Sequence, residues 1–289
     1  MRQILLITWA TFLFGNAVFG ADLSGSSALE FTRRAVGFGP RPAGSVANQK
    51  LQAYILSQLR SFGCLVAEDG FAAKTPGGPV AMKNIIARFP GKSGKAIAIS
   101  GHFDTKLFAG RNFVGASDGG SSTGLLLELA RTLAGKPRTD DVYIVFLDGE
   151  EAFGEWTETD SVYGSRHLAA KWRADGTLSR LKALINLDMI GDKDLNIRQE
   201  TNSTESLRRL FWDTAAELGY QAYFPSSPRI STDDDHMPFL KQGVPAIDII
   251  DFDYPPWHTD GDTLDKLSAR SLEIVGTVTL EVVRRLERQ

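Results

Sequence analysis

Short apolar runs, each long enough for a buried strand, alternate along this chain with segments of helical periodicity. The runs span residues 82–89, 96–100, 142–147, 183–187 and 246–250. Apolar residues recur with the spacing of one helix face in the segments 28–62, 122–133, 161–172, 204–218 and 264–286, and a Gly- and Pro-rich stretch at 37–45 interrupts the first. Strands that alternate with helices are typical of an α/β fold. We therefore predict a twisted, mainly parallel or mixed central sheet with helices on both faces.

The chain shows no division into separate folded units. No internal repeat, low-complexity tract or long linker interrupts its 289 residues, so we expect a single domain and a monomer. A formal net charge of −3 provides no basic field for phosphate, and we expect no nucleic-acid partner. Cys64 is the single cysteine, which excludes an intramolecular disulfide, so stability must come from the hydrophobic core.

Residues 1–20 have the pattern of a secretory signal peptide. Arg2 gives a short positive start, an apolar stretch follows, and Val18 and Gly20 are small enough for cleavage after residue 20. An uncleaved membrane anchor is the alternative, although the apolar run is short and interrupted by polar residues. We expect export to a periplasm or to the extracellular medium, a mature domain of residues 21–289, and no membrane contact after cleavage.

Acids and a histidine gather at the ends of the predicted strands. They are His102, Asp104, Asp148, Glu150, Glu151, Asp188, Asp248 and Asp251. Asp118 lies in the loop GASDGGSSTG before a helix, and His258 lies in the turn-rich stretch DYPPWHTDGDT. One aspartate after a strand is usually a helix cap or a turn former. A set of this size favours a functional site, because ligands of open sheets bind beyond the carboxyl ends of the strands.

Three of these residues, Asp118, Glu151 and His258, form a donor set that suits zinc. Two carboxylates and an imidazole would leave a position open for water or substrate, as catalytic zinc requires. They come from separate loops, so their spacing alone does not force them together. Glu150 precedes Glu151, and adjacent acids on an irregular turn can point apart, with one binding metal and the other carrying protons. A pair of solvated like charges is the alternative.

Several strings resemble the motifs of the zinc aminopeptidase superfamily, in that family's order. They are HFDT at 102–105, GASDGG at 115–120, DGEEAF at 148–153, NLDMIG at 186–191 and WHTDGDT at 257–263. The longer strings DGEEAFGEWTETDSVYGSRHLA at 148–169 and STDDDHMPFLKQGVPAIDII at 231–250, with the pair Trp257-His258, are similar to the animal-type glutaminyl cyclases. The resemblance implies a zinc aminopeptidase-like fold over residues 21–289. It also implies the conversion of N-terminal glutamine of peptides to pyroglutamate with release of ammonia.

The resemblance assigns a role to each candidate residue. The ligands of one zinc per chain would be Asp118, Glu151 and His258. The group that carries and shares the catalytic proton would be Glu150, Asp188 and Asp235. The residues that shape the glutamine pocket would be Trp156, Trp257 and His102. Zinc would polarise the γ-carboxamide, while Glu150 would take a proton from the attacking amine and return it to the leaving ammonia.

An exported di-zinc aminopeptidase is the main alternative. His102 and Asp188 would then bind a second zinc, and Glu150 would activate a bridging water. Cyclisation needs only one Lewis acid, because the α-amine of the substrate is the nucleophile. Trp156 and Trp257 favour the cyclase. A non-catalytic peptide-binding relative is a third alternative, and it would require lost ligands.

The sequence departs from the animal cyclases in two features. It lacks their disulfide cysteines, and Gly119 follows the metal aspartate where they carry a hydroxyl residue. The second departure removes one possible hydrogen bond to the acid group around Glu150. Asp233 and Asp234 directly precede Asp235, the residue of the string at 231–250 to which the resemblance assigns a role, and we expect these two acids to form an exposed cap.

Overall fold

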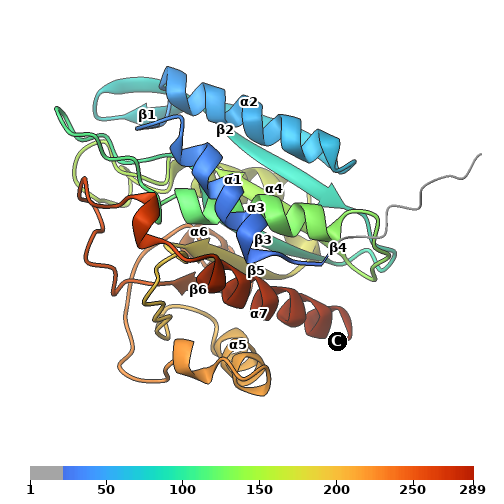
Figure 1. Cartoon of the computed structure of the whole chain (residues 1–289). Helices are drawn as coiled ribbons and strands as arrows, with labels where there is room; N and C mark the ends of the chain where they lie inside the picture. Colours follow the sequence, from blue (N-terminus) through green and yellow to red (C-terminus); the bar gives the residue numbers. More distant parts are fainter. Residues whose placement is uncertain (1–21) are drawn as a thin grey trace, which may run out of the picture.

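The computed structural model describes residues 22–289, so the signal peptide predicted for residues 1–20 lies outside the described residues. The helices are α1 (Gly25–Val36), α2 (Val46–Ser61), α3 (Gly120–Leu133), α4 (Tyr163–Ala174), α5 (Glu205–Glu217), α6 (Met237–Leu240) and α7 (Ala269–Glu287). The strands are β1 (Leu65–Thr75), β2 (Gly78–Phe89), β3 (Ala96–His102), β4 (Asp141–Leu147), β5 (Leu181–Asp188) and β6 (Ala246–Ile250). Short 3₁₀ turns are η1 (Thr177–Arg180), η2 (Gln221–Tyr223) and η3 (Leu264–Lys266). Each predicted strand and helical segment corresponds to one or two of these elements (Figure 1).

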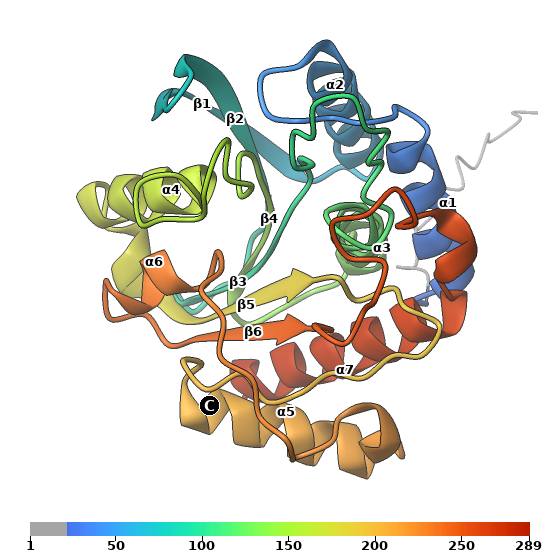
Figure 2. The same cartoon turned by 90° about the vertical axis from the view of Figure 1, so that its left-hand side faces the viewer.

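The strands form one mixed sheet in the order β1-β2-β4-β3-β5-β6. β2 pairs antiparallel with both β1 and β4. The pairs β3–β4, β3–β5 and β5–β6 are parallel. Helices lie on both faces of the sheet, with α4 and α6 on one side and α1, α3 and α7 on the other (Figure 2). The predicted α/β architecture is therefore confirmed, and the sheet is of the mixed kind.

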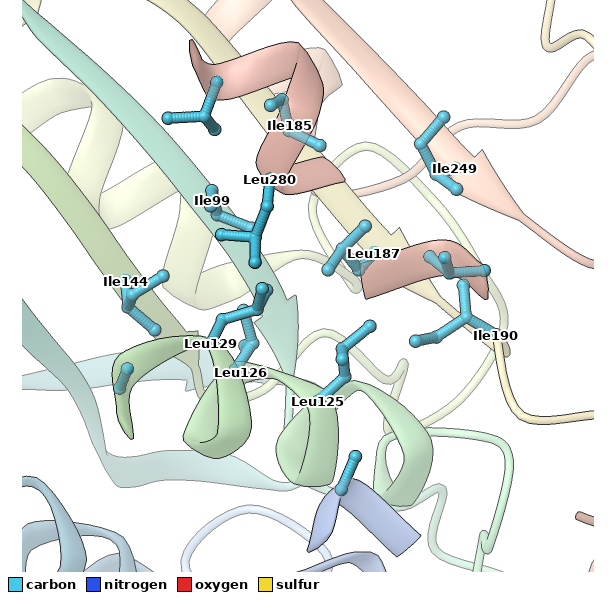
Figure 3. Packing of buried hydrophobic residues seen from close by; sticks show 14 of the residues in the cluster. Ile99, Leu125, Leu126, Leu129, Ile144, Ile185, Leu187, Ile190, Ile249 and Leu280 are labelled. Atoms are coloured by element: carbon cyan, nitrogen blue, oxygen red, sulfur yellow. The ribbon is translucent and has the colours of Figure 1, made fainter. Parts of the chain in front are cut away.

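Alternate side chains of the central strands point to opposite faces of the sheet, and each face has its own hydrophobic core. In β3, Ile97 and Ile99 belong to the larger core, whereas Ala96 and Ala98 belong to the smaller one beside α4 and α6. Figure 3 shows Ile99, Ile144 and Ile185 from neighbouring strands, together with leucines of α3 and with Leu280 of α7. Burial of each such side chain contributes about 1.5–3 kcal/mol relative to exposure. This double burial explains why the strand runs are apolar at most positions rather than at alternate ones.

Serine side chains fix the beginnings of three helices. Ser24, Ser45 and Ser268 cap α1, α2 and α7, and each accepts a hydrogen bond from a backbone N–H of the first turn. The Gly- and Pro-rich stretch separates α1 from α2, as its composition predicts. Within residues 22–289, no helix is long and apolar enough to cross a membrane.

One element differs from the sequence-based expectations. Strand β1 was not expected, because its residues LVAEDGFAAKT show no apolar run. It is an edge strand, and only Asp69 and Ala73 of it are buried. Cys64 is only partly buried, and its burial raises the pKa of the thiol to about 11, which keeps the thiol protonated at neutral pH.

Candidate active site

A pocket of about 650 Å³ lies at the carboxyl ends of the parallel strands. Its walls come from the loops that follow β3, β4 and β6, from the end of β5, and from the segment before α6. The predicted residues that line it are Asp118, Glu150, Glu151, Trp156, Asp188, Trp257 and His258. The strand ends therefore bring residues that are far apart in the sequence to one cavity, as the α/β pattern predicts.

Asp118, Glu151 and His258 converge on one point of this pocket. His258 Nε2 lies 3.2 Å from Glu151 Oε1 and 3.4 Å from Asp118 Oδ2. Together these residues offer ligand atoms that all lie within 4.8 Å of one another. Asp118 Oδ2 is buried and accepts no hydrogen bond. Two buried carboxylates beside an imidazole, one of them with an unsatisfied oxygen, fit a divalent cation of the zinc type.

The pKa values of these three groups follow from their crowding. Burial raises the pKa of Glu151 to about 7, and the charge of Asp118 adds to this effect. Burial alone would also raise the pKa of Asp118, but the nearby imidazoles of His102 and His258 outweigh it and lower this pKa. Burial lowers the pKa of His258, yet the two carboxylates outweigh it and raise this pKa to about 9. The carboxylates therefore attract positive charge to the point on which they converge.

Glu150 is held by its backbone so that its carboxyl group faces the pocket. Its N–H donates to Asp104 Oδ1 at 3.1 Å, and its carbonyl oxygen accepts from Val162 N at 2.8 Å. Burial raises the pKa of Glu150 well above its usual value, and the charges of Glu151 and Asp234 act in the same direction against that of His102. A carboxyl group with a raised pKa can both take up and release a proton near neutral pH.

His102 fills the space between the acids on the far side of Asp118. Its Nε2 lies 3.1 Å from Asp188 Oδ1 and 3.2 Å from Asp118 Oδ1, and its Nδ1 lies 3.5 Å from Asp104 Oδ1. Burial lowers the pKa of His102, but the charges of Glu150 and Asp188 outweigh it and raise the pKa well above 6.5. The ligand atoms of His102, Asp118 and Asp188 also lie within 4.8 Å of one another. The geometry thus contains a second potential metal site, which the aminopeptidase alternative requires.

Gly119 lies directly against this histidine. Its φ of +71° is in the left-handed region. A Cβ atom at this position would lie 2.5 Å from the carbonyl oxygen of Asp104 and 3.1 Å from Cε1 of His102. A hydroxyl residue in place of Gly119 would therefore have to displace the backbone at Asp104 and would press on the imidazole. Glycine at this position therefore fits the close approach of the Asp104 backbone and the His102 ring.

The acids before α6 lie differently from the sequence-based expectation. Asp233 is exposed as expected, but Asp234 is only 3% exposed and lines the pocket, so the expected exposed cap is wrong for Asp234. Burial and the charge of Asp188 raise the pKa of Asp234 to about 6. Asp235 is fully buried behind it and accepts a hydrogen bond of 2.5 Å from Ser165 Oγ. Its predicted part in the proton-sharing group stays a prediction.

Two tryptophans stand at the mouth of the pocket. Trp156 and Trp257 are 42% and 40% exposed, which is high for such large apolar side chains. Trp257 stacks on the ring of His258, with ring centroids 4.3 Å apart. The loop that carries Trp156 is fixed by Asp160, which accepts hydrogen bonds from the N–H groups of Phe153 and Gly154. Both indole rings are thus available to a ligand of the pocket.

Sequence reasoning missed three residues that support the site. Lys106 donates its backbone N–H to Glu151 Oε1 at 3.1 Å. Arg41 and Asp262 are fully buried and bind the backbone of the loop that carries Asp118. Asp262 lies in the quoted string WHTDGDT, so its position in a motif could have drawn attention to it. Nothing in the sequence distinguishes Arg41 or Lys106.

Comparison with known proteins identifies the family. The model of peptidase family M28 matches residues 84–283. The chain belongs to this family. A glutaminyl-peptide cyclotransferase of Drosophila melanogaster is 32% identical to this chain over 273 residues. The match covers 86% of this chain and 76% of the Drosophila protein.

Solved structures of similar proteins cover nearly the whole M28 chain. The glutaminyl cyclase of an Acidobacteriales bacterium has 41% sequence identity and a TM-score of 0.89, and the match covers 98% of this chain and 99% of that chain. A Zn-dependent exopeptidase of Parabacteroides distasonis has 25% identity and a TM-score of 0.84, with coverage of 93% and 100%. The resemblance to glutaminyl cyclases within the zinc aminopeptidase superfamily is thereby confirmed.

Proposed function

We propose that this M28 chain is a glutaminyl-peptide cyclotransferase, which converts the N-terminal glutamine of peptides or proteins to pyroglutamate. The observation that carries the proposal is the place of Glu150 in the pocket. Its buried carboxyl group has a raised pKa, and it lies beside the cluster of Asp118, Glu151 and His258. A proton carrier next to a cation site is what lactam closure requires. The full-length likeness to glutaminyl cyclases supports this assignment.

Asp118, Glu151 and His258 are the residues that would hold one zinc ion. Bound zinc would act as a Lewis acid that polarises the γ-carboxamide of the substrate. The fit of the site to zinc rests on its two carboxylates, its imidazole and the unsatisfied Asp118 Oδ2. The similar structure of a Zn-dependent exopeptidase supports the choice of metal.

Glu150 would move the proton between the two nitrogens of the reaction. Its carboxylate takes a proton from the α-amine as that nitrogen bonds to the γ-carbonyl carbon. It then returns the proton to the departing nitrogen, and the bond to the amide nitrogen breaks with loss of ammonia. The crowding of Glu150 by Glu151, Asp234 and Asp235 favours the protonated form that it adopts between the two transfers.

Trp156 and Trp257 would form the walls around the glutamine side chain, whereas His102, predicted as a third wall residue, is buried against Asp118 and Asp188 and would act through them. The indole rings offer apolar faces at the mouth of the pocket, and they would exclude water from the closing ring. The natural partners would be peptides or proteins with N-terminal glutamine. We further propose that the protein is exported to a periplasm or secreted, and that it acts as a monomer.

A zinc aminopeptidase is the second candidate, and the cluster of His102, Asp118 and Asp188 favours it. The two functions give different products from the same peptides. Purified protein is incubated with a peptide that begins with glutamine and with a matched peptide that begins with alanine, and product masses are recorded. We expect loss of one ammonia from the glutamine peptide alone. Release of free amino acids from either peptide would instead establish the aminopeptidase.

A further inference from the structure

The loop that carries the predicted metal ligand Asp118 is held between two buried residues of opposite charge. This loop joins β3 to α3, and its last residues lie against the loop that follows β6 (Figure 2). Asp262 and Arg41 are both fully buried, and their side chains bind the backbone of the loop. Neither residue lines the pocket, so neither can contact a substrate there.

Asp262 binds consecutive N–H groups of this loop. Its carboxylate accepts from Ser117 N at 2.8 Å and from Asp118 N at 3.1 Å. Its own carbonyl oxygen accepts from Ala116 N at 3.3 Å. Tyr254 donates its hydroxyl to Asp262 Oδ1 at 2.7 Å and so fixes the carboxylate in this orientation. Buried N–H groups cost free energy when they lack an acceptor, so Asp262 is what allows this part of the loop to be buried.

Arg41 binds the carbonyl oxygens of the same loop. Its Nη1 donates to Val114 O, and its Nη2 donates to Gly115 O at 2.8 Å and to Asp118 O at 3.4 Å. Burial lowers the pKa of Arg41 to about 10, so the guanidinium remains charged at neutral pH. The cation therefore binds the acceptors of the loop and the anion of Asp262 binds its donors. The positive charge of Arg41 thus strengthens the hydrogen bonds to the carbonyl oxygens, and the negative charge of Asp262 strengthens those from the N–H groups.

The turn that these partners hold is tight. Gly115 has a φ of +49°, and a Cβ atom there would lie 2.5 Å from the carbonyl oxygen of Asp118. The loop that follows β6 also carries His258, and the N–H of Asp262 donates to Thr259 O at 3.1 Å in the turn directly after that histidine. One loop thus supplies a ligand and also fixes the backbone of a second ligand.

We propose that Asp262 is a positioning residue for the metal: it sets the place of Asp118 relative to His258 and thereby sets the affinity for zinc. The proposal rests on the zinc site of the proposed function, but it concerns residues outside the pocket. Partners that orient metal ligands typically change metal affinity by about 10- to 100-fold when they are removed. We expect a loss of this size for Asp262→Asn, because an amide replaces one acceptor oxygen with a donor that faces an N–H.

The test measures the zinc dissociation constant by competition with a chelator of known affinity. Asp265→Asn is the matched control, since it changes an acid of the same loop whose side chain is 68% exposed. We expect the dissociation constant to rise about 10- to 100-fold for Asp262→Asn and to stay within about twofold for Asp265→Asn. Unchanged zinc affinity of Asp262→Asn would overturn the proposal.

Two further measurements separate positioning from a general loss of structure. Tyr254→Phe removes only the hydroxyl that orients Asp262, and it should weaken zinc binding severalfold; if Asp262→Asn does not fold, unchanged affinity in Tyr254→Phe overturns the proposal. Activity of Asp262→Asn should return when zinc is added in excess, whereas a merely structural defect would not respond. If the unaltered protein binds zinc but does not cyclise glutamine peptides, the proposed function fails while the positioning role stands. If it binds no zinc, both fail.

Discussion

His102 Nε2 lies 3.1 Å from Asp188 Oδ1, so the imidazole pairs with the same carboxylate that would be a ligand of a second metal. The same nitrogen lies 3.2 Å from Asp118 Oδ1. A histidine so placed can serve either as a pocket residue held by its neighbours or as a metal ligand. The two functions considered for this chain differ in which of these roles it takes.

The first prediction follows from this contact. We expect one equivalent of zinc in protein purified without added metal, measured by plasma mass spectrometry. His258→Ala should lose the ion, because it removes a ligand of the site with Asp118 and Glu151. His102→Ala should retain it. Two equivalents, with one lost in His102→Ala, would count against the cyclase.

The second prediction concerns proton transfer by Glu150. Glu150→Gln keeps the shape of the side chain but cannot carry a proton, so kcat should fall by about two to four orders of magnitude. Zinc content should not change, because Glu150 is outside the predicted ligand set, and the thermal midpoint should not fall, because the amide has no charge to bury. Glu158→Gln is the control, since this acid of the same loop has a side chain that is 91% exposed. Full activity of Glu150→Gln would refute the assigned role.

The third prediction concerns the tryptophan at the mouth of the pocket. Trp257→Ala removes an exposed indole face that would contact the substrate, at a cost of about 1–1.5 kcal/mol. We expect kcat/KM for a glutamine peptide to fall about tenfold, mainly through KM. Trp257→Phe should recover part of the loss because it keeps an aromatic face. Leu218→Ala, an exposed apolar residue after α5 that does not line the pocket, should change nothing.

Zinc content must be measured in the same samples, since Trp257 stacks on His258. A loss of activity that follows a loss of zinc would show that the indole supports the metal ligand instead of the substrate.

The sequence alone predicts those parts of the fold and the site that depend on the residue pattern of one segment or on the order of the strands. The run 246–250 is β6 with the same bounds, because its three isoleucines favour a strand and turn formers flank it. Asp118, Glu151 and His258 meet because the strands before their loops end at one edge of the sheet.

The remainder depends on contacts that the sequence does not state. Strand β1 is stabilised by backbone pairing with β2 rather than by an apolar run. Which of Asp234 and Asp235 faces the pocket is decided by the turn before α6, where the two neighbours point in different directions. Arg41 was missed because its partners are carbonyl oxygens, which every residue possesses.

The last prediction concerns stability and pH at the opposite end of the sheet from the pocket. Asp141, the first residue of β4, is buried and accepts hydrogen bonds from Gly91 N at 2.7 Å and from Arg88 Nε at 3.0 Å, as well as from Arg180. Burial alone would raise the pKa of Asp141, but these donors outweigh it and lower this pKa below its usual value.

A carboxyl group whose pKa is lowered by folding binds fewer protons in the folded state, so it contributes stability above the pKa of the unfolded chain, about 3.9. Asp141→Asn should therefore lower the free energy of unfolding by about 1–3 kcal/mol at pH 7. The difference from the unaltered protein should stay constant down to about pH 5 and shrink below about pH 4, as Asp141 becomes protonated.

Urea unfolding over this pH range measures this difference in the free energy of unfolding. Any loss of zinc in acid cancels, because both proteins carry the same site. Asp213→Asn, at an exposed position of α5, should show no such pH dependence. A difference that grows as the pH falls would contradict the role assigned to Asp141.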